Sequence, residues 1–207
     1  MTIPLETADP DTLTAWMRGR RSIRRYRPVP LPPGTVERLT DAARFAPSAH
    51  NRQPWRFAVL NDAEKARLAD AMGARLRADR CADDDPADAI ELDIARSRAR
   101  IVSSPAVIAA CFTLADMDRY PDARRMDAER TMAIQSTAMA VQNMLLLAHA
   151  EGLGACWVCA PLFCPDTVRA ALALPDDWEP QALITFGHPA NGGRMRERRA
   201  VAEVLRP

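Results

Sequence analysis

The stretch that decides how this chain is read is Arg20-Arg21-Ser22-Ile23-Arg24-Arg25-Tyr26-Arg27-Pro28. Guanidinium groups are permanently charged, forked donors, so several of them meeting at one place suit a phosphate or an anionic ring edge. A run of this kind can equally be a solvated surface or a patch that docks on nucleic acid. The run alone therefore leaves both interpretations open.

A second stretch follows, Ala46-Pro47-Ser48-Ala49-His50-Asn51-Arg52-Gln53-Pro54-Trp55. The side chains of Ser48, Asn51 and Gln53 offer neutral donors and acceptors that can bind the edge of a flat heterocycle. Pro47 and Pro54 bracket the loop and favour an extended backbone before each of them. The two stretches together predict a site for an anionic cofactor.

The composition restricts the class of protein. The chain has 207 residues with no internal repeat, and we expect a single domain over residues 1–207. With 28 basic and 27 acidic residues the net charge is +1, so no global field steers the chain onto nucleic acid. The arginines are expected to act locally.

Five cysteines, an odd number, fit reduced thiols in a cytoplasm better than a disulfide framework. Cys156 and Cys159 have the CxxC spacing of a redox or metal pair, yet no second pair or histidine cluster accompanies them. We expect ordinary strand packing there and no metal site. Residues 1–11 lack the features of a secretory signal, and no run reaches about 18 apolar residues, so we expect a cytoplasmic protein without a membrane span.

Helical patterns alternate irregularly with short apolar runs, which predicts an α+β fold. Helices are expected at 12–20, 35–45, 62–80, 87–99, 126–150 and 165–173, and strands at 55–60, 105–112, 155–160 and 182–187. A polar loop is expected at 115–130. The polar excursion at 62–100 is either a solvated helical surface or a mobile lid over a ligand.

The helical pattern at 126–150 is the longest, and apolar residues cover most of its circumference. A chain this short can hardly bury such a helix alone, so we expect a dimer. Gln135, Gln142 and His149 recur every seven residues as a narrow polar stripe. The stripe faces either a cofactor or a partner subunit, or it is simply hydrated.

Four separated motifs carry a resemblance that covers nearly the whole chain: RRSIRRY, APSAHNRQPWRF, AVQNMLLLAHAEGLGACW and ITFGHPA. In this order they resemble the flavin-dependent nitroreductase family. The second half, with Glu151-Gly152-Leu153-Gly154, Phe163-Cys164-Pro165-Asp166 and Leu174-Pro175-Asp176-Asp177-Trp178, is similar to one branch in particular. That branch is the reductase domain attached to the gamma-glutamyl ligase of deazaflavin coenzyme biosynthesis. The resemblance implies a central, mostly antiparallel sheet of four to five strands flanked by helices, in an interlocked homodimer.

The resemblance also implies FMN as cofactor and assigns its contacts. Arg20, Arg21 and Ser22 resemble the phosphate and ribityl contacts, and Arg24 the cation near flavin N1. Asn51 resembles the amide at the ring edge. The other predicted cofactor contacts are Pro47, Ser48, Gln142, Val158, Cys159 and Ala160, and Arg196, Arg198 and Arg199 of a C-terminal arm at 188–207.

The implied activity is hydride transfer through flavin N5, from NADH, NADPH or another donor to an electron-poor acceptor. A dehydrogenated deazaflavin-coenzyme precursor is one candidate acceptor. His50 and Tyr120 are candidate substrate contacts that could donate a proton, or they serve only in loop hydrogen bonding. The alternatives are a flavin-binding or coenzyme-storage protein without turnover, and a protein that binds nucleic acid through its arginines.

Overall fold

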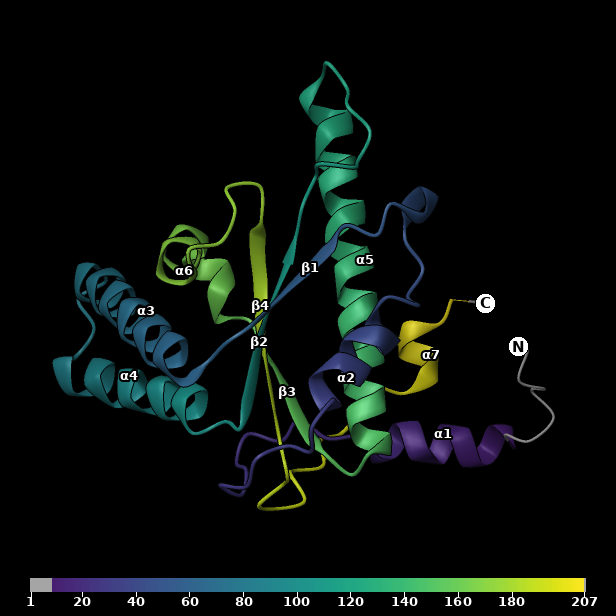
Figure 1. Cartoon of the computed structure of the whole chain (residues 1–207), viewed down its shortest axis with the longest axis horizontal. Helices are drawn as coiled ribbons and strands as arrows, with labels where there is room; N and C mark the ends of the chain where they lie inside the picture. The colour runs from purple at the N-terminus through teal and green to yellow at the C-terminus, as the bar shows by residue number, and fades with distance from the viewer. Residues whose placement is uncertain (1–8, 207) are drawn as a thin grey trace.

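A computed structural model of the protein describes residues 9–206, so the expectation drawn from residues 1–11 about a secretory signal falls mostly outside this range. The centre is a four-stranded antiparallel sheet with the order β1-β2-β4-β3 (Figure 1). The strands are β1 (Trp55–Val59), β2 (Ala106–Phe112), β3 (Gly154–Val158) and β4 (Glu179–Gly187). The predicted α+β fold with a mostly antiparallel sheet is confirmed.

The two central strands are the most apolar ones. Every residue of β2 is buried, and so is every residue of β4 after Glu179. Because successive side chains point to opposite faces, Ile108 packs on one side of the sheet and Val107 on the other. A strand buried on both faces reads as a continuous apolar run, which explains why β2 was predictable.

Helices cover both faces of the sheet (Figure 1). On one face α2 (Thr35–Ala43) and α5 (Ala123–Ala150) bury Leu39, Val141 and Met144 against the sheet. On the other face α3 (Asp62–Ala82) and α6 (Pro165–Leu172) bury Leu68 and Val168. Helix α4 (Ala87–Val102) packs beside α3.

The excursion at 62–100 is thus a layer of the fold as well as a polar surface. Asn61 caps α3, because its side chain accepts from the Glu64 N–H while the Glu64 carboxylate accepts from the Asn61 N–H. Leu68, Ala69 and Met72 of α3 lie in the core. The lid role of this segment stays a prediction.

Several boundaries differ from the sequence-based ones for local reasons. Helix α1 (Pro10–Gly19) begins two residues early, because the Asp9 carboxylate accepts from the Thr12 N–H at 3.0 Å. The second half of the predicted loop at 115–130 is helical, because Asp122 caps α5 by accepting from the Arg125 N–H. Strand β4 begins at Glu179, three residues earlier than predicted, through pairing with Cys111 and Phe112 beyond a bulge.

The remaining elements are short. Strand β3 ends at Val158, two residues before its predicted end, and the 3-10 turn η3 (Ala160–Phe163) follows. A second 3-10 turn, η2 (Ala49–Asn51), lies before β1, and α7 (Val201–Val204) lies in the C-terminal arm. Among residues 9–206, none of the helices combines the length and the apolar character that a membrane crossing requires.

Candidate functional site

Ile23 and Tyr26 hold the arginine-rich stretch against the end of the sheet. Ile23 is buried, and its backbone N–H donates to the Ala155 carbonyl at 3.0 Å. The Tyr26 hydroxyl lies 2.7 Å from the Ile23 carbonyl oxygen and 2.7 Å from the Thr185 hydroxyl. Burial raises the pKa of Tyr26 well above its usual range, so this phenol stays a neutral hydrogen-bonding group.

The C-terminal segment runs alongside this stretch. The Arg27 N–H donates to the His188 carbonyl at 2.8 Å, and the Ala190 N–H donates to the Arg25 carbonyl at 3.0 Å. A β-carbon on Gly193, whose φ is +72°, would stand 2.8 Å from the Ile23 side chain. Only a glycine allows this close approach without strain.

Arginines from the two ends of the described chain meet in one cavity of about 420 Å³, which we call the phosphate cavity. It is lined by Arg20, Arg21, Ser22, Arg24, Arg25, Asn191, Gly193, Arg194, Arg196 and Arg198. No carboxylate lines it, and within residues 9–206 none of its arginines forms an ion pair. Such an arrangement suits a phosphate, because uncompensated guanidinium groups favour an anion.

A second cavity, of about 620 Å³, adjoins the first and shares Arg20, Arg21, Arg196 and Arg198 with it. Gln142 of α5, a predicted cofactor contact, lines this second cavity together with Arg20 and Arg21. His149 of the same polar stripe stacks on Trp16 with ring centroids 5.3 Å apart, and so fastens α1 to α5.

The loop at 46–55 lies at the opposite end of the sheet. Trp55 pairs with Phe112, and Phe112 pairs with Glu179 at the start of β4. Ser22 instead bridges to Ala155, beside the far end of β4. A nine-residue strand is roughly 26 Å long, so one chain does not bring Pro47, Ser48, His50 and Asn51 to the phosphate cavity.

Three residues of this loop have left-handed backbone conformations although none is glycine. The φ angles are 49° at His50, 54° at Asn51 and 50° at Gln53. The Ser48 hydroxyl accepts from the Gln53 N–H at 3.0 Å and closes the loop. Residues held in sparsely populated conformations cluster at ligand sites, which favours a functional role for this loop.

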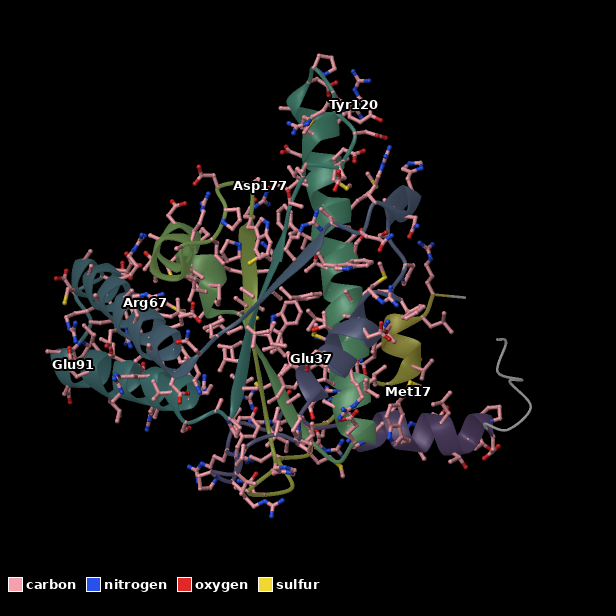
Figure 2. The ribbon with its side chains drawn as sticks, in the orientation of Figure 1. Met17, Glu37, Arg67, Glu91, Tyr120 and Asp177 are labelled. Atoms are coloured by element: carbon pink, nitrogen blue, oxygen red, sulfur yellow. The ribbon has the colours of Figure 1, made fainter. Side chains whose placement is uncertain are left out.

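Tyr120 lies near the N-terminal tip of α5, at the other end of the molecule from Met17 of α1 (Figure 2). The Arg125 guanidinium stacks over its ring at 4.6 Å. Tyr120 therefore lies far from the phosphate cavity of its own chain, as His50 does. Their role as substrate contacts stays a prediction.

The segment Val158-Cys159-Ala160 follows edge strand β3, whose last residue pairs with Leu183 in the middle of β4. Val158 is buried and Cys159 is exposed, with its sulfur 3.1 Å from the Trp157 indole nitrogen. This segment lies between the two ends of the sheet.

Arg199 does not line the phosphate cavity; its guanidinium lies 3.9 Å from the Glu203 carboxylate. Arg25 was predicted only as part of the arginine-rich stretch, and Asn191, Gly193 and Arg194 were not among the predicted cofactor contacts, although all four line the cavity. The available signal was Gly192-Gly193 directly before Arg194, since glycines allow two segments to approach closely.

A comparison with family models matches residues 17–188 to the one described as "Nitroreductase family". The chain belongs to the nitroreductase family. The predicted family and its oxidoreductase class are therefore confirmed. The finer resemblance to the deazaflavin ligase's reductase domain stays a prediction.

Relatives match over nearly the full length. A NADH dehydrogenase of Thermus thermophilus is 32% identical over 203 residues, covering 94% of this chain and 95% of that protein. A 5,6-dimethylbenzimidazole synthase of Rhodospirillum rubrum is 30% identical over 201 residues, covering 95% and 88%. A nitroreductase of Desulfovibrio desulfuricans, solved in complex with FMN, has a TM-score of 0.72 at 30% identity and covers 96% of each chain.

Proposed function

We propose that the protein is an FMN-dependent oxidoreductase that transfers hydride from a reduced nicotinamide to an electron-poor acceptor. The observation that carries this proposal is the phosphate cavity, where arginines from both ends of the described chain converge. Family membership and the FMN-bound relative support it.

The residues of the cavity fit the phosphate end of FMN. Its lining provides arginines and the Ser22 hydroxyl as donors, without a carboxylate that would repel an anion. Bound FMN supplies the hydride chemistry at its N5 position. In this proposal Arg20, Arg21 and Arg198 hold the phosphate, while Arg24 places positive charge near the ring edge where the reduced cofactor is anionic.

We further propose a homodimer, because two sets of predicted cofactor contacts lie at opposite ends of the sheet, with the segment Val158-Cys159-Ala160 between them. The first set lines the phosphate cavity, and the second is the strained loop with Pro47, Ser48 and Asn51. Both sets reach one FMN only if two chains contribute to the site.

The apolar surface beside the first set supports association. Helices α1, α5 and α7 lie on one side of the molecule (Figure 1). They and the adjoining arm expose large apolar side chains: Leu13, Met17, Met139, Met195, Val201, Val204 and Leu205. Exposed apolar surface of this kind marks interaction sites, which fits a second copy of the chain.

The physiological reaction has two candidates, reduction of an electron-poor acceptor and formation of a benzimidazole. The motifs of the second half favour a dehydrogenated deazaflavin-coenzyme precursor. The relatives named 5,6-dimethylbenzimidazole synthase favour formation of 5,6-dimethylbenzimidazole instead. Mass spectrometry of reaction mixtures distinguishes the two, because each predicts a different product.

The test is the absorbance spectrum of the purified protein, followed by anaerobic reduction with NADH or NADPH. We expect a yellow protein that is bleached by the nicotinamide and recovers its colour when an acceptor is added. A protein that stays colourless in the presence of FMN contradicts the proposal. A protein that binds FMN but never oxidises nicotinamide is instead a flavin-binding or storage protein.

A further inference from the structure

A second basic depression lies beside the phosphate cavity, between α4 and the arginine-rich stretch. We call it the α4 groove; it encloses about 670 Å³ and is lined by Arg24, Arg25, Tyr26, Arg96, Ala99, Arg100, Ser103 and Ala190. Arg24 and Arg25 form the wall that it shares with the phosphate cavity. Among the described residues 9–206, no acidic side chain lines it.

Four of the seven arginines of the helix pair α3 and α4 lie against a carboxylate, and a fifth, Arg67, donates to the Ala171 carbonyl at 2.6 Å. Arg75, Arg77, Arg80 and Arg98 each lie within 2.8 Å of a carboxylate oxygen. The two that face the groove differ. Within residues 9–206 Arg100 forms no ion pair although it is half-buried.

In the part of the chain that the structure describes, the one carboxylate near Arg96 is that of Asp93, at 3.7 Å. That carboxylate already accepts from Arg80 at 2.6 Å. A guanidinium that shares an engaged partner keeps most of its capacity to bind another anion. The groove thus holds positive charge that the fold itself leaves uncompensated.

The guanidinium groups of the two segments act on the same region. Burial raises the pKa of Cys156 and that of Tyr26. The positive charges of Arg24 and Arg100 both act in the opposite direction on each of these pKa values. The helix dipole favours a cation in the last turn of a helix. This effect explains a positive charge at Arg100, which lies in the last turn of α4, but not at the other arginines of the groove. Arg96 lies before that turn, and Arg24 and Arg25 belong to a segment without a helix.

One phosphate does not balance this charge. Seven arginines line the phosphate cavity, and Arg96 and Arg100 add two more across the shared wall. A phosphate monoester carries about −1.5 to −2 charges at neutral pH. The charge on the far side of Arg24 and Arg25 therefore suits a second anion.

We propose that the α4 groove binds a phosphate group of the second substrate, while the phosphate cavity holds that of FMN. This inference rests on the proposed function, because it assumes that FMN occupies the first cavity. Arg96 and Arg100 then act as specificity-determining residues for a phosphorylated donor or acceptor. Two guanidinium groups one helical turn apart on α4 can engage such a group together with Arg24 or Arg25.

The first experiment measures binding of inorganic pyrophosphate to the FMN-saturated protein by calorimetry. We expect the double variant R96A/R100A to bind pyrophosphate about tenfold more weakly or worse, while it retains FMN. R98A is the matched control: Arg98 lies on the same helix but pairs with Asp70 at 2.8 Å, and losing such an exposed pair costs little. Pyrophosphate affinity of R98A should equal that of the unaltered protein.

A second experiment identifies which substrate carries the phosphate, using pairs that differ by one phosphate group. If the donor carries it, R96A/R100A raises KM for NADPH about tenfold and changes KM for NADH much less. If the acceptor carries it, the variant raises KM for free FMN as acceptor but not for riboflavin, with both donors unaffected. Either pattern supports the inference.

Two results overturn it. Unchanged pyrophosphate affinity in R96A/R100A shows that the groove is not a phosphate site. Loss of FMN from the folded double variant shows that the groove belongs to the flavin site itself. Failure of the unaltered protein to bind FMN is a different outcome, because it refutes the proposed function before the groove is tested.

Discussion

Ile23 lies so close to Gly154 that a β-carbon on this glycine would stand 2.7 Å from the Ile23 Cβ and Cγ2 atoms. Real β-carbons essentially never approach another heavy atom this closely. The absence of a side chain at the first residue of β3 therefore lets the middle of the arginine-rich stretch pack on the sheet. Ile23 is buried while the arginines on either side of it line the phosphate cavity.

We expect Gly154→Ala to destabilise the protein by about 1–3 kcal/mol, the usual cost of overpacking a well-packed site. Ile23 must shift, and the flanking arginines shift with it, so FMN affinity should fall as well. Urea unfolding and FMN titration measure the two effects. Gly192→Ala is the control, because a β-carbon there meets nothing within 4 Å. Wild-type stability in the Gly154 variant would show that the contact is not needed.

Arg198 and Arg199 are adjacent in the sequence but lie in different surroundings. Substituting each in turn therefore separates loss of a cavity arginine from loss of a positive charge outside the cavity. Arg198 lines the phosphate cavity, whereas Arg199 lies near Glu203. We expect Arg198→Ala to weaken FMN binding about tenfold. This loss corresponds to the lower end of the free energy of a charge-assisted hydrogen bond, because the Arg198 side chain is exposed. The difference should shrink at high salt, since solvent-exposed charges are screened. Arg199→Ala should bind FMN normally, and equal losses in both variants would contradict the assignment.

The sequence predicted those parts of the fold that depend on local pattern. The apolar run of β2 and the arginine-rich stretch stand out without any knowledge of the tertiary structure. It could not show that the stretch and the loop at 46–55 end up at opposite ends of the sheet, because strand register fixes that separation. The contribution of Gly193 to the phosphate cavity likewise depends on a long-range contact with Ile23.

Cys111 makes the stability of the protein depend on alkaline pH. The thiol is buried in β2, and burial raises its pKa to about 12 from an ordinary value near 9. Since the folded-state pKa lies above the unfolded one, the stabilising contribution is complete below about pH 9. It is lost as the pH rises from about 9 towards 12, by at most about 1.4 kcal/mol per pH unit.

The measurement is the free energy of unfolding in urea at a series of pH values. Cys111→Ala should flatten the decline above pH 9, although the cavity it leaves lowers stability at every pH. Cys81→Ala is the control, because this thiol is exposed. An unaltered slope in the Cys111 variant would mean that other groups, such as Tyr26, cause the decline.

The two-chain site makes a prediction that a one-chain site does not share. The variant R20A/R198A damages the phosphate cavity, and Asn51→Ala damages the strained loop at the other end of the sheet. Each variant alone should bind FMN poorly, because both sites of its homodimer are impaired. In a mixed dimer one site receives both damaged parts and the other receives both intact parts.

Equal amounts of the two variants are mixed, and native mass spectrometry follows the exchange of subunits. Half of the dimers should then be mixed, and each mixed dimer has one intact site. Tight FMN binding should therefore return to about a quarter of all sites. FMN titration counts these sites, and each variant treated alone is the control. If mixed dimers form but no tight sites return, the loop and the phosphate cavity do not share one FMN. A single chain would then have to hold the cofactor with the phosphate cavity alone, and Asn51→Ala would leave FMN affinity unchanged.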